Sequence, residues 1–116
     1  MSVDKVERLR RGEDIRRVFR TRRVAHGRLL SVHVAARGSA GPPRVAVMAG
    51  RGVGNAVRRN RAKRRVRALL GEGVVGGGVD VVVVARRGMV DAPFDGARAE
   101  LAALLERART VARVSQ

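Results

Sequence analysis

Residues 51–70 read RGVGNAVRRNRAKRRVRALL. Asn55 follows the glycine-containing lead, and Asn is a favoured N-cap because its side-chain oxygen accepts a hydrogen bond from an unpaired amide of the first helical turn. We therefore predict a helix over residues 56–70. At 100° per residue, the basic side chains lie on one side of this helix, and the other side is apolar, formed by Ala62, Val66, Leu69 and Leu70. The apolar side predicts burial against the rest of the chain.

The basic side of this helix has no acidic partners. No Asp or Glu occurs from residue 15 to residue 71, so the Glu–Lys pairs that support many exposed helices are missing and the like charges repel one another. A bound polyanion would relieve this repulsion, and the free amides at the helix N-terminus would also attract phosphate. A solvated basic face is the ordinary alternative. We interpret the helix as a surface that binds nucleic acid.

Two motifs within these residues resemble the protein subunit of bacterial ribonuclease P. That family carries Val-Gly-Asn-Ala-Val followed by Arg-Asn-Arg-x-Lys-Arg, matched here at residues 53–57 and 59–64. The resemblance covers about residues 6–108. In an ideal helix Arg59 points toward the apolar side, so two roles stay open for it: binding RNA or stabilising the fold. The resemblance implies an RNA-subunit-binding surface formed by Arg51, Asn55, Arg58, Arg59, Asn60, Arg61, Lys63, Arg64 and Arg67.

The composition favours one small domain with an anionic partner. The 116 residues suffice for a single domain with a modest core, and 26 Lys+Arg against 10 Asp+Glu give a net charge of +16. Such a charge attracts phosphate polymers or anionic membranes. No wholly apolar run, such as residues 81–85, is long enough to span a membrane, and the start lacks the apolar segment of a signal peptide. The absence of cysteine excludes disulfides and thiolate metal sites and is consistent with a cytoplasmic protein.

The first part of the chain predicts a short amphipathic helix. Residues 1–11 are polar and basic, and we expect a mobile arm there. Ile15, Val18 and Phe19 follow the i, i+3, i+4 spacing of one helix side, which predicts a helix over residues 12–20. The arginines between them point elsewhere.

Three strands are predicted from alternation and from apolar content. Residues 24–37 alternate, so we expect a strand with one core face and one mixed face. The turn-forming residues 38–43 separate it from a second strand over residues 44–49, most simply antiparallel to the first. Residues 79–85 are apolar nearly throughout, as in a strand covered on both faces.

A final helix completes one α+β domain over residues 1–116. Asp95 is its expected cap, residues 110–116 are expected to fray, and its apolar side contains Leu101, Leu104, Leu105 and Ala108. The element order is then α-β-β-α-β-α, a single-domain sandwich with a small mixed sheet. General rules favour a right-handed β-α-β crossover. The family resemblance implies the unusual left-handed form, which we adopt.

The sequence does not indicate a protein-only active site. We do not expect His26 or His33 to act with a Ser or Cys nucleophile, and the carboxylates are scattered. Asp80 precedes an apolar strand and is expected to cap it or to pair with an arginine rather than to bind metal. The glycines of residues 50–54 match neither common phosphate-loop motif. We therefore assign no catalytic residue and no metal ligand on the protein.

The resemblance also implies a second RNA site, a cleft between the first helix and the sheet. The family lines this cleft with aromatics and holds there the single-stranded 5′ leader of precursor tRNA. Those positions fall on Ile15, Phe19 and His33. Only Phe19 keeps a large ring; His33 could stack on a base, and Ile15 offers apolar contact. The alternative for Phe19 is a core position, because it shares the helix side of Val18.

The function implied by the resemblance is that of an accessory subunit of a ribonucleoprotein endonuclease. Its partners would be ribonuclease P RNA and precursor tRNA, and one protein copy would join each complex. The RNA subunit would hold the magnesium ions and carry the chemistry, so the protein alone would be inactive and would need no organic cofactor. A small ribosomal or nucleoid-associated nucleic-acid-binding protein would explain the charge equally well, but not the two motifs.

Overall fold

The computed structural model describes residues 7–37, 40–73 and 75–114, with side chains up to residue 108. It contains five strands, three α-helices and two 3-10 helices, η1 and η2. In chain order these elements are β1 (Glu7–Arg8), α1 (Gly12–Arg20), β2 (Val24–His26), β3 (Leu30–Ala36), β4 (Arg44–Ala49), η1 (Arg51–Val53), α2 (Ala56–Leu70), β5 (Val79–Ala85), η2 (Arg87–Val90) and α3 (Phe94–Val114).

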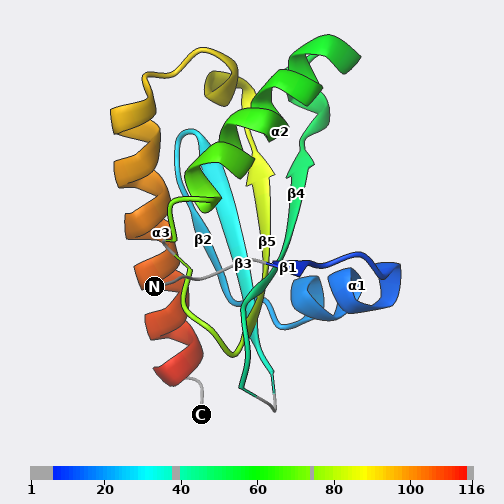
Figure 1. The fold of residues 1–116 in the computed structure, drawn as a ribbon, viewed down its shortest axis with the longest axis vertical. Helices are drawn as coiled ribbons and strands as arrows, with labels where there is room; N and C mark the ends of the chain where they lie inside the picture. The colour runs from blue at the N-terminus through cyan, green and yellow to red at the C-terminus, as the bar shows by residue number, and fades with distance from the viewer. Residues whose placement is uncertain (1–6, 38–39, 74, 115–116) are drawn as a thin grey trace.

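The strands form one mixed sheet in the order β1-β4-β5-β3-β2 (Figure 1). β4 is parallel to β1 and β5, whereas β3 is antiparallel to both β5 and β2. The predicted α+β class and mixed sheet are confirmed. β3 and β4 do run in opposite directions, as expected, but β5 lies between them. Helix α2 connects the parallel neighbours β4 and β5, and the left hand of this crossover stays a prediction.

The predicted strand over residues 24–37 is a hairpin of two strands. The amide of Gly27 donates to the carbonyl oxygen of Leu30 at 2.8 Å and closes the turn between β2 and β3. The Glu100 carboxylate of α3 accepts hydrogen bonds from the amides of Leu29 and Leu30, at 2.7 and 2.9 Å. A side chain at position 27 would collide with this carboxylate. The break between β2 and β3 therefore depends on Glu100, which lies 70 positions away from Leu30 in the sequence. The alternation of residues 24–37 alone cannot reveal this contact.

The two faces of the sheet carry different helices, and Figure 1 shows α1 on the side away from α3. One face packs against α2 and α3, and alternate β3 residues Leu30, Val32 and Val34 belong to its large apolar core. The opposite face packs against α1 through a smaller cluster. Five buried residues form that cluster: Leu9, Val18, Ala35, Ala46 and Val82. The smaller cluster leaves part of this face uncovered.

The N-terminal segment is more ordered than the sequence suggests. Residues 1–6 of the predicted mobile arm lie outside the described part, but Glu7 and Arg8 pair with β4, and Leu9 is buried. An arm over residues 1–11 is therefore too long. At the other end α3 begins at Phe94, so Asp95 lies within its first turn rather than at its cap, and the backbone is helical through Val114. No helix within the described ranges is long and apolar enough to cross a membrane.

Candidate nucleic-acid interface

Helix α2 has the boundaries and the buried side that the sequence predicts. Asn55 is its N-cap, and the Asn55 Oδ1 atom accepts a hydrogen bond from the amide of Arg58 at 3.0 Å. The first turn contains no acidic residue, so the positive end of the helix dipole is not neutralised there. All four predicted apolar residues are buried: Ala62, Val66, Leu69 and Leu70. The exposed positions of the helix include five arginines together with Ala56, Val57, Asn60 and Ala68.

Most basic side chains of α2 are free to meet a ligand. Arg59 is exposed, which resolves its direction away from the core. Lys63 is half-buried, whereas Arg64 and Arg67 are exposed. Arg51 lies just before the helix in η1 and is exposed as well. Within the described chain, no side-chain hydrogen bond or ion pair engages Arg51, Arg59, Asn60, Lys63, Arg64 or Arg67.

Two arginines of α2 instead hold the segment that follows β5. Arg61 Nε donates to the carbonyl oxygen of Val90 at 2.9 Å, and Arg65 NH1 donates to the same oxygen at 2.7 Å. Arg65 NH2 also donates to Ala92 O, and its guanidinium lies 4.6 Å from the ring centroid of Phe94. The predicted RNA-binding residue Arg61 therefore has a structural contact, and Arg65 was not predicted to have any role. Arg58 is similar, since its Nε donates to Val53 O at 3.2 Å.

The predicted cleft residues meet on the sheet face that α1 partly covers. The rings of Phe19 and His33 lie edge to face with centroids 4.6 Å apart, and Phe19 is 36% exposed. Phe19 is therefore a rim residue rather than a core residue. Ile15 is half-buried and packs against the small cluster around Val18. Ile15, Phe19 and His33 are thus brought to one region, although 18 residues separate Ile15 from His33 in the sequence.

A second row of side chains lies beside this pair. Strand pairing aligns Met48, Val84, Ser31 and His26 across β4, β5, β3 and β2. Met48 is 41% exposed and His26 is exposed, whereas Ser31 between them is buried. We call this row, together with Phe19 and His33, the open face. The row itself was not recognised in the sequence, because its four residues come from four strands whose order only the fold determines.

Two histidines lie side by side on the open face. The His26 Nδ1 atom and the Ser31 hydroxyl are 3.1 Å apart, and the His26 and His33 ring centroids are 6.4 Å apart. Burial, and secondarily the neighbouring His26, lowers the pKa of His33 below its ordinary value of 6.5. The lowered pKa favours the neutral form of His33, whose ring lies beside Phe19.

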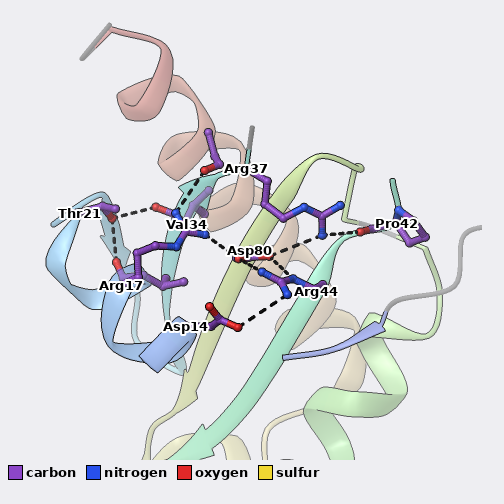
Figure 2. Close-up of polar contacts among 10 residues, drawn as sticks. Asp14, Arg17, Thr21, Val34, Arg37, Pro42, Arg44 and Asp80 are labelled. Carbon is purple, nitrogen blue, oxygen red and sulfur yellow. Dashed lines mark hydrogen bonds and ion pairs between the residues drawn. The ribbon is translucent and has the colours of Figure 1, made fainter. Parts of the chain in front are cut away.

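A buried carboxylate anchors α1 above the sheet. Asp80 has no exposed surface and accepts hydrogen bonds from Arg17 NH2 at 2.7 Å and from Arg44 Nε and NH2 at 2.8 and 2.6 Å (Figure 2). Arg37 NH1 lies 3.6 Å from Asp80 Oδ1, the oxygen to which Arg44 Nε also donates. Burial by itself would raise the pKa of Asp80, but the hydrogen bonds from Arg44 and Arg17 lower it below its ordinary value. The expectation that Asp80 pairs with an arginine is confirmed.

Further contacts tie the same helix to the sheet. Arg17 NH1 reaches the carbonyl oxygen of Ala36 at 3.4 Å, and Asp14 lies 3.7 Å from Arg44 NH1. At the end of α1, the Thr21 hydroxyl shares its proton between the carbonyl oxygens of Val18 and Val34, at 2.8 and 3.0 Å (Figure 2). Because Ile15 and Phe19 lie on α1, these contacts also set the position of the open face's rim.

Among the described residues, no group of three or more His, Asp or Glu side chains could hold a metal ion. Several carboxylates are engaged within the protein: Asp80 by arginines, Glu100 by backbone amides, and Glu72 and Asp95 by Arg98.

The chain is similar to known proteins over most of its length. The model of the ribonuclease P family matches residues 3–109. The ribonuclease P protein component of Symbiobacterium thermophilum is 38% identical over 112 residues, covering 91% of this chain and 94% of that protein. That of Syntrophomonas wolfei is 32% identical over 113 residues, covering 96% and 94%.

Solved structures of the same kind share the fold. The ribonuclease P protein from Thermotoga maritima superposes with a TM-score of 0.74 at 30% identity, covering 87% of this chain and 96% of that one. The protein from Staphylococcus aureus gives a TM-score of 0.72 at 22% identity, covering 88% and 94%, and supports the fold alone. The family match spans nearly the whole chain and includes both motifs around α2. The chain therefore belongs to the ribonuclease P family, as the protein component of an RNA-containing endoribonuclease.

Proposed function

We propose that this protein binds the ribonuclease P RNA through the basic side of α2 and receives the 5′ leader of precursor tRNA on its open face. The observation that carries the proposal is the pairing of two separate surfaces on one small domain. One is a row of unpaired cations along α2, and the other is an uncovered sheet face with the Phe19–His33 ring pair. A general nucleic-acid-binding protein would need only the first.

The basic side of α2 suits a folded RNA. Arg64 and Arg67 are exposed and without protein partners among the described residues, so their guanidinium groups can donate two parallel hydrogen bonds to phosphate. Asn55 starts the helix at its positive dipole end, which adds attraction for phosphate. Binding would release counterions from the RNA and would therefore weaken steeply with salt.

The open face suits a single strand. Unpaired bases can lie against aromatic rings and apolar side chains, whereas the bases of a duplex are already stacked on one another. Phe19 and His33 provide rings, and Met48 and Val84 provide apolar surface beside them. Ile15 would contribute apolar contact from α1.

The chemistry would belong to the RNA subunit. Among the described residues, no group of three or more His, Asp or Glu side chains could hold magnesium ions, and the Ser31 hydroxyl that lies beside His26 Nδ1 is buried. The ions would be held mainly by RNA phosphates, and the protein would lower the repulsion between the RNA subunit and precursor tRNA. One protein copy would serve each complex, in the bacterial cytoplasm where tRNA is processed.

Reconstitution with a bacterial ribonuclease P RNA tests this division of labour. At low magnesium, adding the protein should accelerate 5′ maturation of precursor tRNA, because arginine side chains replace part of the screening that magnesium otherwise provides. High salt or high magnesium should shrink the gain. Purified protein without that RNA should cleave no faster than background.

Two outcomes would contradict the proposal. Magnesium-dependent cleavage by RNA-free protein would place the chemistry on the protein. No stimulation of the RNA at any magnesium concentration would instead favour a ribosomal or nucleoid-associated role, and sequencing the RNA that co-purifies with the protein would then identify its ligand.

Truncation of the ring at Phe19 tests the open face. Stacking on an aromatic contributes about 1–3 kcal/mol per base, so Phe19→Ala should weaken binding of a precursor with a long leader by about fivefold or more. His33→Tyr, which enlarges the neighbouring ring, should leave that affinity equal or improve it. Both variants are measured in the reconstituted complex by equilibrium binding of precursor and mature tRNA. Equal effects on the two RNAs would show that these side chains do not contact the leader.

A further inference from the structure

The turn between α1 and β2 holds an arginine in an unfavourable backbone conformation. Arg22 has φ = 56° and is the sole non-glycine residue with positive φ in the described part of the chain. For an L-residue this left-handed region brings Cβ close to the following carbonyl oxygen, and Gly or Asn adopts it with less strain. Because arginine has a Cβ atom, the backbone of Arg22 is strained at this position.

The conformation of Arg22 is imposed by its neighbours. On one side the Thr21 hydroxyl is bound to the carbonyl oxygen of Val34, at 3.0 Å. On the other side the carbonyl oxygen of Arg23 accepts a hydrogen bond from the Val34 amide, also at 3.0 Å. Both neighbours are thus fixed to the same residue of β3, and the residue between them must reverse the chain. The side chain of Arg22 contributes nothing to this turn.

The side chain of Arg22 is free. It is exposed, and no hydrogen bond or ion pair engages its guanidinium within the described ranges. This sets it apart from Arg17 on the preceding helix, which is bound to Asp80. Strained backbone that the surrounding structure over-determines is concentrated at binding and catalytic sites, and a free guanidinium is a strong phosphate ligand.

The turn also borders the ring pair of the open face. The amide of Arg22 donates to the carbonyl oxygen of Phe19 at 3.3 Å, and Phe19 in turn lies against His33. A base placed on these rings would bring its own phosphate close to the turn, because base and phosphate belong to the same nucleotide. Ile15 and Phe19 cannot neutralise that phosphate.

We propose that Arg22 binds a phosphate of the single-stranded leader whose bases lie against Phe19 and His33. This inference rests on the proposed function, and it adds a charged contact to a face otherwise formed by rings and apolar side chains. It makes Arg22 a residue that distinguishes precursors with a leader from mature tRNA. The turn places the backbone of Arg22 next to that of Phe19, and the exposed guanidinium is available to a nucleotide bound on the rings.

The test replaces Arg22 with residues that separate its charge from its backbone strain. Arg22→Asn removes the charge and suits the left-handed conformation, whereas Arg22→Lys keeps both the charge and the strain. Arg107→Ala is the matched control, because Arg107 is an exposed cation on α3, which covers the other face of the sheet. Each variant is assembled with a bacterial ribonuclease P RNA, and binding is measured for precursor tRNA with a long leader and for mature tRNA.

For Arg22→Asn we expect about a fivefold loss of affinity for the long-leader precursor at 0.1 M salt, and a fall of about 0.7 in the slope of log affinity against log salt. Affinity for mature tRNA should stay within twofold, and the melting temperature of the protein should be unchanged or a few degrees higher. Arg22→Lys and Arg107→Ala should both retain the preference for the leader.

Three results would overturn the inference. Unchanged leader affinity in Arg22→Asn would show that Arg22 is no contact, although the proposed function would survive if the unaltered protein still prefers the precursor. An equal loss for precursor and mature tRNA would assign the charge to the tRNA body or to the RNA subunit. If the unaltered protein shows no preference for the leader at all, the proposed function of the open face fails together with this inference.

Discussion

Replacing Arg64 and Arg67 by Ala is expected to weaken binding of the protein to ribonuclease P RNA by about 25- to 60-fold at 0.1 M salt. Each lost phosphate contact removes about 0.7 to 0.9 from the slope of log affinity against log salt, and the two losses multiply at low salt. Both side chains are exposed and lack partners among the described residues. The double variant should therefore keep its melting temperature, and the binding titrations should be run from low to high salt.

Arg65 provides the matched control on the same helix. Its guanidinium donates to Val90 O and Ala92 O and lies over Phe94. Arg65→Ala should leave those carbonyl groups short of a donor and lower the free energy of unfolding by about 1–3 kcal/mol, with little change in the salt slope. If Arg64→Ala/Arg67→Ala unfolds more easily but keeps the salt slope of the unaltered protein, these two side chains are structural and the assigned RNA surface is wrong.

The second large effect is expected at Asp80. Asp80→Asn should lower the free energy of unfolding by about 3 kcal/mol, because it leaves the facing cations of Arg17, Arg37 and Arg44 without their shared counter-charge. Arg17 and Arg44 keep about a third of their side-chain surface exposed, so solvent limits the loss to the lower end of the range for buried pairs. Denaturant unfolding followed by circular dichroism measures this change.

The pH dependence of stability provides an independent check on Asp80. Its pKa in the folded protein lies below the ordinary value of 3.8. The ion pairs therefore contribute fully above about pH 4, and this contribution is lost as the pH falls through the folded pKa. Asp80→Asn should remove this contribution to the loss of folding stability at acid pH. Glu72→Gln, which breaks an exposed pair with Arg98, should change the free energy of unfolding little. A loss of stability as large as that of Asp80→Asn would show that burial of Asp80 does not explain its effect.

Asp80 also links stability to the RNA-binding surface. Arg17 connects it to α1, and α1 carries Phe19 on the rim of the open face. A variant that loosens this anchor would shift Phe19 relative to His33. We therefore expect Asp80→Asn to affect leader binding more than binding of the RNA subunit, because α2 packs on the opposite face of the sheet.

The sequence by itself determined the elements whose signals are local. Asn55 caps α2 through the amide of Arg58, three residues away, and the apolar positions of α2 recur with the helical period. The α+β class, the strands over residues 44–49 and 79–85, and the RNA-binding family motifs could be read in the same way. Each depends on residues within a few positions of one another, where backbone geometry alone sets which side chains share a face.

Only the tertiary structure decided how these elements combine. β5 inserts between β3 and β4, and β2 separates from β3 at a turn fixed by Glu100. The same long-range packing gives Arg61 a structural contact and leaves Arg64 free, although both are arginines on one basic helix. It also brings three arginines to Asp80 and aligns His26 with Met48 across four strands. Such contacts join residues tens of positions apart, and their free energy depends on burial and strand order, which periodicity along the chain does not encode.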